Sequence, residues 1–136
     1  MGLAALVAGC GGSKPTVEDA KPFADDFVHR LVVVGTWDSI NAEVGPDVTP
    51  EMRKFQPQIR KDGMRKVDGP GELRHDCPSA PSVGAGKDCF AYEISGKQVI
   101  PLGGVHPIKA RFRIWVDRTG DRWEVINYDY SVLPPS

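Results

Sequence analysis

The chain has 136 residues, 40% of them hydrophobic, which is enough for one domain with a core and excludes a chain that is disordered throughout. Its 17 basic and 18 acidic residues give a net charge of −1, which argues against nucleic-acid binding because such binding needs excess positive charge. No apolar run reaches the roughly 18 residues that a membrane-spanning helix needs.

The first predicted element is a targeting segment. Residues 1–9 are apolar and become small before Cys10, and a short flexible tether completes residues 10–15. The pattern resembles the end of a bacterial lipoprotein signal peptide, whose basic start is expected upstream of Met1. The resemblance implies cleavage before Cys10, acylation of that residue (palmitate among the acyl groups) and anchoring in the bilayer on the extracytoplasmic face of the cell membrane.

Residues 16–34 carry the strongest helical pattern, and Gly35 is expected to end this helix. His29 falls on the face opposite the apolar stripe, so it is expected in solvent. The stripe consists of Ala20, Phe23, Ala24, Phe27, Val28 and Leu31.

Two further helices are expected before the pattern changes. A short helix begins at Trp37, and a third begins at Thr49, where a Pro follows an N-cap residue, and ends at Pro57 or Lys61. Residues 64–74 are charged and interrupted by Gly-Pro-Gly, so they are expected to form at best a weak edge strand.

Two cysteines flank a stretch without hydrophobic periodicity. Cys77 and Cys89 are an even pair, and in an oxidising compartment we expect them to form a disulfide across a loop. The alternative is a metal site that adds His75 and Asp76, but this set lacks a recognised ligand spacing. No metal or other cofactor is therefore expected.

The remaining residues predict an antiparallel sheet. Strands are expected at 90–95, 99–102, 106–117 and 122–133, with Gly120 left-handed at the end of a three-residue loop. This loop pairs Trp115 with Trp123 and puts apolar residues of both strands on one face. The other face then carries a candidate surface for a protein partner or a second subunit, formed by Arg111, Arg113, Trp115 and Trp123. The alternative is that Arg and Trp stack there for local stability alone.

The order of these elements predicts a single α+β domain over residues 16–136, with N-terminal helices packed on a curved antiparallel sheet. The Gly-Thr-Trp-Asp junction at 35–38 and the Trp-Glu-Val-Ile-Asn-Tyr segment at 123–128 resemble the nuclear transport factor two-like superfamily. That resemblance implies a conical pocket between sheet and helices. Members such as ketosteroid isomerase and scytalone dehydratase are enzymes, whereas many others only bind ligands or partners.

An isomerase-like site needs a carboxylate base in an apolar pocket and an acid that holds the oxyanion. The candidate pocket residues are Trp37, Asp38, Tyr92, Phe112 and Tyr128. Asp38 fits equally well as the start of a helix, and Tyr128 as a core residue, so no catalytic residue is assigned.

These patterns together predict a membrane-anchored extracytoplasmic lipoprotein that is non-enzymatic and binds a protein, a second copy of itself or a small apolar ligand. Two alternatives remain open at this point. One is an isomerase- or dehydratase-like enzyme that uses a pocket carboxylate, and the other is an accessory domain of an envelope complex.

Overall fold

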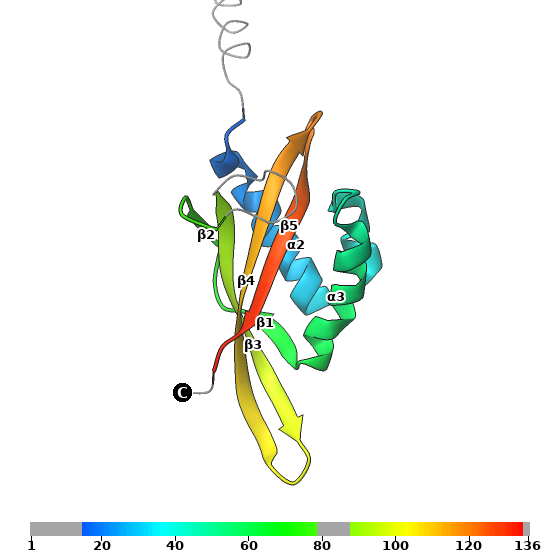
Figure 1. The fold of residues 1–136 in the computed structure, drawn as a ribbon, viewed down its shortest axis with the longest axis vertical. Coiled ribbons are helices and arrows are strands. Elements are labelled where there is room, and N and C mark those ends of the chain that lie inside the picture. The colour runs from blue at the N-terminus through cyan, green and yellow to red at the C-terminus, as the bar shows by residue number, and fades with distance from the viewer. Residues whose placement is uncertain (1–14, 79–87, 135–136) are drawn as a thin grey trace, which may run out of the picture.

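The computed structural model describes residues 15–78 and 88–134. The fold is α+β, as predicted: helical segments come first, and a five-stranded antiparallel sheet follows with the helices on one of its faces (Figure 1). Cys10 and the signal-like residues 1–9 lie outside the described residues, so the lipidation stays a prediction.

The N-terminal helical stretch has three consecutive parts. They are a 3-10 turn, η1 (Val17–Ala20), the helix α2 (Lys21–His29) and a π-helical segment, η2 (Arg30–Val34). The predicted apolar stripe faces the core, with only Phe23 partly exposed, and His29 is exposed as expected. Gly35 ends the stretch with a φ of 73°, a left-handed conformation that glycine adopts without steric penalty.

The next segment differs in part from the prediction. Two 3-10 turns, η3 (Trp37–Ser39) and η4 (Asn41–Glu43), take the place of the short second helix. The helix α3 (Thr49–Lys61) contains Pro57 and continues to Lys61, the longer of the two predicted ends. The Thr49 hydroxyl donates a hydrogen bond to the Gly45 carbonyl at 2.8 Å, so this residue does not act as the predicted N-cap.

Three long strands form the main part of the sheet. β3 (Cys89–Ile100), β4 (Gly104–Thr119) and β5 (Arg122–Val132) are consecutive antiparallel neighbours. β1 (Met64–Val67) and β2 (Glu72–Arg74) both pair with β3 along the edge that β4 leaves free. The edge position expected for residues 64–74 is therefore confirmed.

The turn between β4 and β5 is tighter than predicted. Thr119 pairs with Arg122 across the two residues Gly120 and Asp121, so the predicted three-residue loop is wrong. Gly120 does adopt the expected left-handed conformation, with a φ of 64°. A two-residue turn with a left-handed first position follows the twist of the flanking strands.

A β-bulge between Trp115 and Val116 changes the rest of the register. Trp115 lies opposite Asn127, and Trp123 lies opposite Arg118. The predicted Trp115–Trp123 pair is therefore wrong. Because the bulge adds one residue to β5, Trp123 turns to the helix side of the sheet, where it packs partly buried against the main core.

The core lies between one face of the sheet and the helices. Six side chains of β3 and β4 alternate onto this inner face and are buried against α2 and α3: Phe90, Tyr92, Ile94, Ala110, Phe112 and Ile114. The opposite, outer face of the sheet carries the residues between them, including Ala91, Glu93, Arg111 and Arg113.

Candidate functional site

The residues predicted to line a pocket pack in or beside the core. Tyr92 and Phe112 are buried, Trp37 and Tyr128 are half-buried against the same cluster, and Asp38 is exposed on η3. The cavity described below is lined by none of the five. The structure therefore does not bring them together as a site.

An aromatic cluster occupies the space between α3 and the sheet. The Phe55 ring centroid lies 5.7 Å from that of Phe112, 4.7 Å from Tyr128 and 5.0 Å from Tyr130. The Tyr130 hydroxyl donates a hydrogen bond to Asp62 at 2.7 Å, and burial together with this carboxylate raises the pKa of Tyr130. The tyrosine therefore stays protonated and holds the C-terminal end of α3 against the sheet.

A second polar contact joins α2 to the sheet. The Asp25 carboxylate accepts hydrogen bonds from the Tyr92 hydroxyl at 2.8 Å, the Gly71 N–H at 2.9 Å and the Lys21 ammonium at 2.8 Å. Partial burial alone would raise the pKa of Asp25, but the three donors and the Lys21 charge together lower it. The Asp25 carboxylate therefore links α2 to β3 and to Gly71.

We expect Asp25→Asn to lower the free energy of unfolding by about 1–2 kcal/mol at neutral pH, because three donors lose a charged acceptor. Folding lowers the pKa of Asp25, so its stabilisation is present above the unfolded value of about 3.9 and disappears as the pH falls through the folded value. Urea unfolding at neutral pH and near pH 2 measures this difference.

Asp26→Asn is the matched control. Asp26 forms an ion pair with Arg30, one turn further along the N-terminal helical stretch, and its side chain is 63% exposed. It should change stability by less than about 0.5 kcal/mol. A loss for Asp25→Asn that persists unchanged near pH 2 would contradict the assignment of the effect to the carboxylate charge.

The predicted disulfide is confirmed: Cys77 and Cys89 are bonded, with their Cα atoms 6.1 Å apart. Trp115 packs against this bond on the outer face and is only 3% exposed. The alternative metal site is not formed, since both sulfurs are in the disulfide and the His75 Nδ1 atom lies 2.7 Å from Asp88. No group of three or more potential metal ligands occurs among the described residues.

The four residues predicted as a partner surface do not form one surface. Trp115 is covered by the disulfide, and Trp123 lies on the helix side with the Arg118 guanidinium 5.3 Å from its ring centroid. Arg111 and Arg113 do share the outer face. There they line an open cavity of about 230 Å³, together with Arg74, Asp76, Cys77 and Ala91.

The charges around this cavity are unevenly compensated. The Arg113 Nε atom lies 3.0 Å from Asp129, Arg74 lies 3.1 Å from Asp76, and Lys109 lies 3.1 Å from Glu93. Arg111 stands between Lys109 and Arg113 on β4, is exposed, and forms no ion pair or hydrogen bond with another described residue. Its guanidinium is therefore available to an anionic group from outside the chain.

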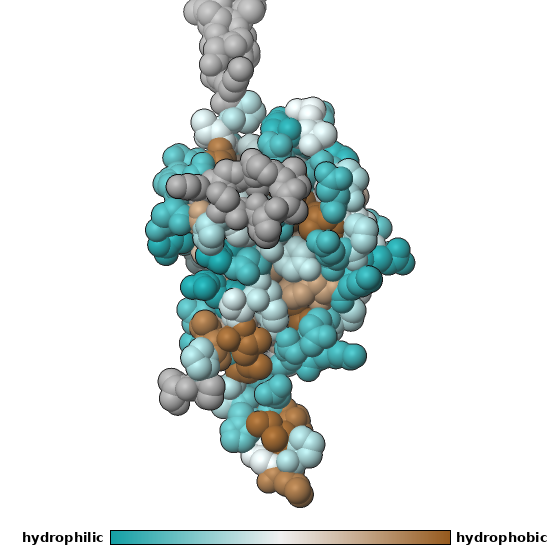
Figure 2. Space-filling model, in the orientation of Figure 1, coloured by the Kyte–Doolittle hydropathy of each residue, from teal (hydrophilic) through white to brown (hydrophobic). Residues whose placement is uncertain are grey.

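A second surface feature was not predicted. The hairpin that joins β3 to β4 projects beyond the body of the domain (Figure 1), and Figure 2 shows hydrophobic side chains gathered at its end. Val99 is 74% exposed, Val105 is 58% exposed and Leu102 is fully exposed. The signal in the sequence was an apolar run placed in a turn, where polar residues are usual.

No family model matches this chain, and searches of curated proteins and of solved structures find no match either. Within the described ranges, no helix is long and apolar enough to cross a bilayer.

Proposed function

We propose that this protein is a non-enzymatic binding module, held on the extracytoplasmic face of the cell membrane by lipid on Cys10, that contacts an acidic protein partner through the outer face of its sheet. The observation that carries the contact surface is the exposed Arg111 guanidinium beside the cavity, which pairs with none of the residues that the structure describes.

The disulfide supports the proposed location. Disulfides persist in oxidising compartments and are rare in the reducing cytoplasm. The Cys77–Cys89 bond also shapes the outer face, because Cys77 itself lines the cavity beside Arg111. An extracytoplasmic location therefore provides the oxidising conditions in which the disulfide beside this surface persists.

The filled inner face supports binding rather than catalysis. In the superfamily that the sequence resembles, an enzyme site lies between the helices and the sheet, and here Phe55 and its aromatic neighbours occupy that space. Asp25 on α2 has a lowered pKa, and its carboxylate accepts hydrogen bonds from three donors. Both features suit a carboxylate that stays ionised and has a structural role. We also propose the nuclear transport factor two-like relationship itself, on the order of helices and strands and the one-sided helix cover.

Arg111 distinguishes this surface from an ordinary charged sheet face. On β4 the cations at 109 and 113 have carboxylates within 3.1 Å, so a partner gains little by approaching them. No described residue accepts a hydrogen bond from the Arg111 guanidinium. Arg can bind a carboxylate through two parallel N–H···O hydrogen bonds. A partner with an Asp or Glu side chain fits this position, with the Ala91 methyl group forming an apolar part of the cavity lining.

We expect Arg111→Gln to weaken binding of an acidic probe peptide, hexaglutamate, by about tenfold at low salt, because a charge-assisted contact is lost. Nuclear magnetic resonance titration of the full chain measures the affinity and shows which backbone amides respond. Signals of β3 and β4 around the cavity should shift in the wild type.

Arg53→Gln is the matched control. Arg53 lies exposed on α3, so its replacement changes the net charge equally without touching the outer face. Equal losses for the two variants would show that the peptide responds only to net charge, and shifts confined to other elements would place the contact elsewhere. Either result overturns the proposed surface.

A further inference from the structure

Within the part of the chain that the structure describes, the end of the β3–β4 hairpin pairs with no third strand. β1 pairs with β3 only as far as Gly96, and β5 pairs with β4 only as far as Ala110. The Lys97 N–H donates the last hydrogen bond to the body, to the Gly63 carbonyl at 3.1 Å. Beyond it, residues 98–100 and 104–106 pair with each other alone within the described part of the chain, and the two strands extend past the body as a two-stranded ribbon (Figure 1). An isolated two-stranded ribbon is marginally stable in water, so a role in contact explains its length better than a role in the core.

Apolar side chains surround the end of this ribbon. Val99 pairs with Val105 on one face, and Ile100, the next residue along β3, points to the other face. Leu102 stands in the turn between them with a φ of 68°, a left-handed conformation that favours glycine or asparagine over leucine. Residues 99–105, called the hairpin tip below, thus expose hydrophobic side chains on both faces of the ribbon and in its turn. Figure 2 shows part of this surface from one side.

The backbone of the tip has few donors that need water. Pro101 and Pro107 carry no N–H, and the Gly103 N–H donates to the Ile100 carbonyl at 2.9 Å. The His106 Nε2 atom lies 2.6 Å from the Gly103 carbonyl oxygen. Moving this turn out of water therefore leaves few polar groups without partners.

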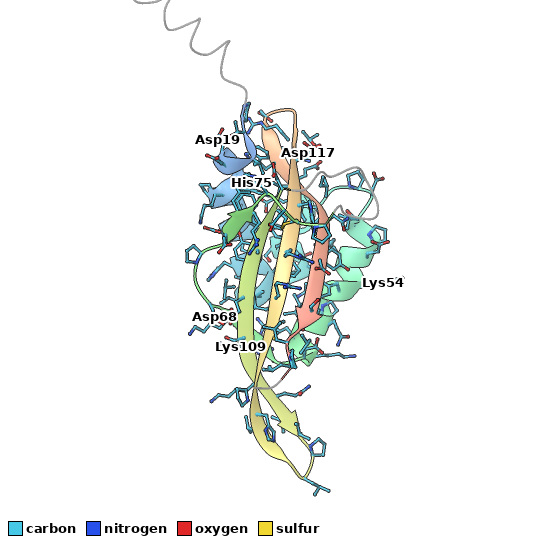
Figure 3. The ribbon with its side chains drawn as sticks, turned by 60° about the vertical axis from the view of Figure 1, so that its left-hand side comes forward. Asp19, Lys54, Asp68, His75, Lys109 and Asp117 are labelled. Atoms are coloured by element: carbon cyan, nitrogen blue, oxygen red, sulfur yellow. A yellow bond between two sulfur atoms is a disulfide. The ribbon has the colours of Figure 1, made fainter. Side chains whose placement is uncertain are left out.

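The charge next to the tip is positive. Lys97 lies on the ribbon, and no acidic residue occurs between Gly96 and Lys109. Lys109 lies on β4 where the ribbon leaves the sheet, and it is paired with Glu93 (Figure 3). An anionic surface therefore meets no repulsion along the ribbon.

We propose that the hairpin tip inserts into the surface of a lipid bilayer that contains anionic headgroups. A protein groove would favour apolar residues on one face of the ribbon, whereas a bilayer offers the same apolar medium on all sides, as the arrangement of Val99, Ile100 and Leu102 requires. Lys97 then lies at the level of the headgroups.

This inference is independent of the contact proposed at Arg111. The tip lies at the opposite end of the domain from the first described residues, drawn in blue (Figure 1), and it contains none of the residues that line the cavity beside Arg111.

The Leu102→Trp variant of the full chain places a fluorescent reporter at the tip. Its signal is the difference between the fluorescence emission spectra of the variant and the wild type. With vesicles of phosphatidylcholine and phosphatidylglycerol, we expect its emission to shift to the blue and to be quenched by brominated acyl chains. With phosphatidylcholine alone, or with added salt, both effects should weaken, because the attraction between Lys97 and the headgroups is lost or screened.

The double variant Leu102→Asn and Val105→Thr should reduce vesicle binding by about tenfold, since it removes apolar surface with residues that suit a left-handed turn and a strand. Val34→Thr is the matched control, because Val34 is also an exposed valine, 47% accessible, but lies at the end of η2. Lys97→Gln should lower the preference for anionic lipid, whereas Lys54→Gln on α3 should not.

Two outcomes would overturn the proposal. One is a Leu102→Trp variant whose emission and quenching do not respond to vesicles. The other is a concentration-dependent dimer, seen by sedimentation equilibrium without lipid, that the double variant at 102 and 105 converts to monomer, which would assign the tip to a second copy of the chain.

Discussion

Phe112→Ala is expected to lower the free energy of unfolding by about 4 kcal/mol, because a fully buried aromatic side chain is replaced by a methyl group and leaves a cavity. Phe112 stands on the inner face of β4 and stacks on Phe55 of α3. Its removal therefore weakens the packing of the sheet against that helix. Urea unfolding followed by far-ultraviolet circular dichroism measures the loss, with the change in midpoint read at constant slope.

Phe23→Ala is the control for this experiment. Phe23 belongs to the apolar stripe of the N-terminal helical stretch, but it remains partly exposed, so its loss should be clearly smaller. If the two substitutions proved equally destabilising, the aromatic cluster under α3 would not be the centre of the core.

Replacing both Cys77 and Cys89 by alanine is expected to lower the free energy of unfolding by about 3 kcal/mol, because the unfolded chain regains the entropy of an open loop. The native state also loses the contact of Trp115 with the disulfide. The wild type measured with a reducing agent should approach the double variant in urea unfolding.

Cys10→Ser supplies the control when both proteins are produced without lipid attachment, since it then removes a thiol that takes no part in the Cys77–Cys89 bond. Its unfolding midpoint should match that of the wild type. A wild-type midpoint that does not respond to reductant would contradict a stabilising disulfide.

Much of the fold could be predicted from hydrophobic spacing. The stripe from Ala20 to Leu31 repeats with helical period, and the strict alternation of β4 assigns Phe112 and Ile114 to one face and Arg111 and Arg113 to the other. These assignments held because burial selects one face of an element regardless of its exact partner.

The register of β4 and β5 could not be predicted in the same way. Arg113 lies opposite Asp129 instead of Val125, a shift by an even number of residues, so side chains before the bulge keep their predicted face. Beyond the bulge the shift is odd, and Trp123 changes sides. A bulge adds a residue without altering the composition of the strand, so the pattern of residue types does not reveal it.

The candidate site was predicted only in part. Arg111 and Arg113 were selected because Arg is common at protein interfaces, and both lie on the outer face. Among the described residues, Arg113 has a carboxylate partner and Arg111 has none. This difference follows from the positions of Asp129 and Glu93, which depend on the register. The sequence does not reveal the hairpin tip, because apolar residues at 99–102 fit the continuation of a sheet as well as its free end.

The contacts between the first helices and the strands also determine when the chain can fold during its synthesis. The hydrogen bond from Tyr92 to Asp25 joins residues 67 positions apart, and the Val125 carbonyl accepts a hydrogen bond from the Gly45 N–H at 2.8 Å. The apolar side of α2 therefore leaves the ribosome well before the strands that cover it. Such distant pairings make folding slow, so the domain reaches its native state only after β5 has been made.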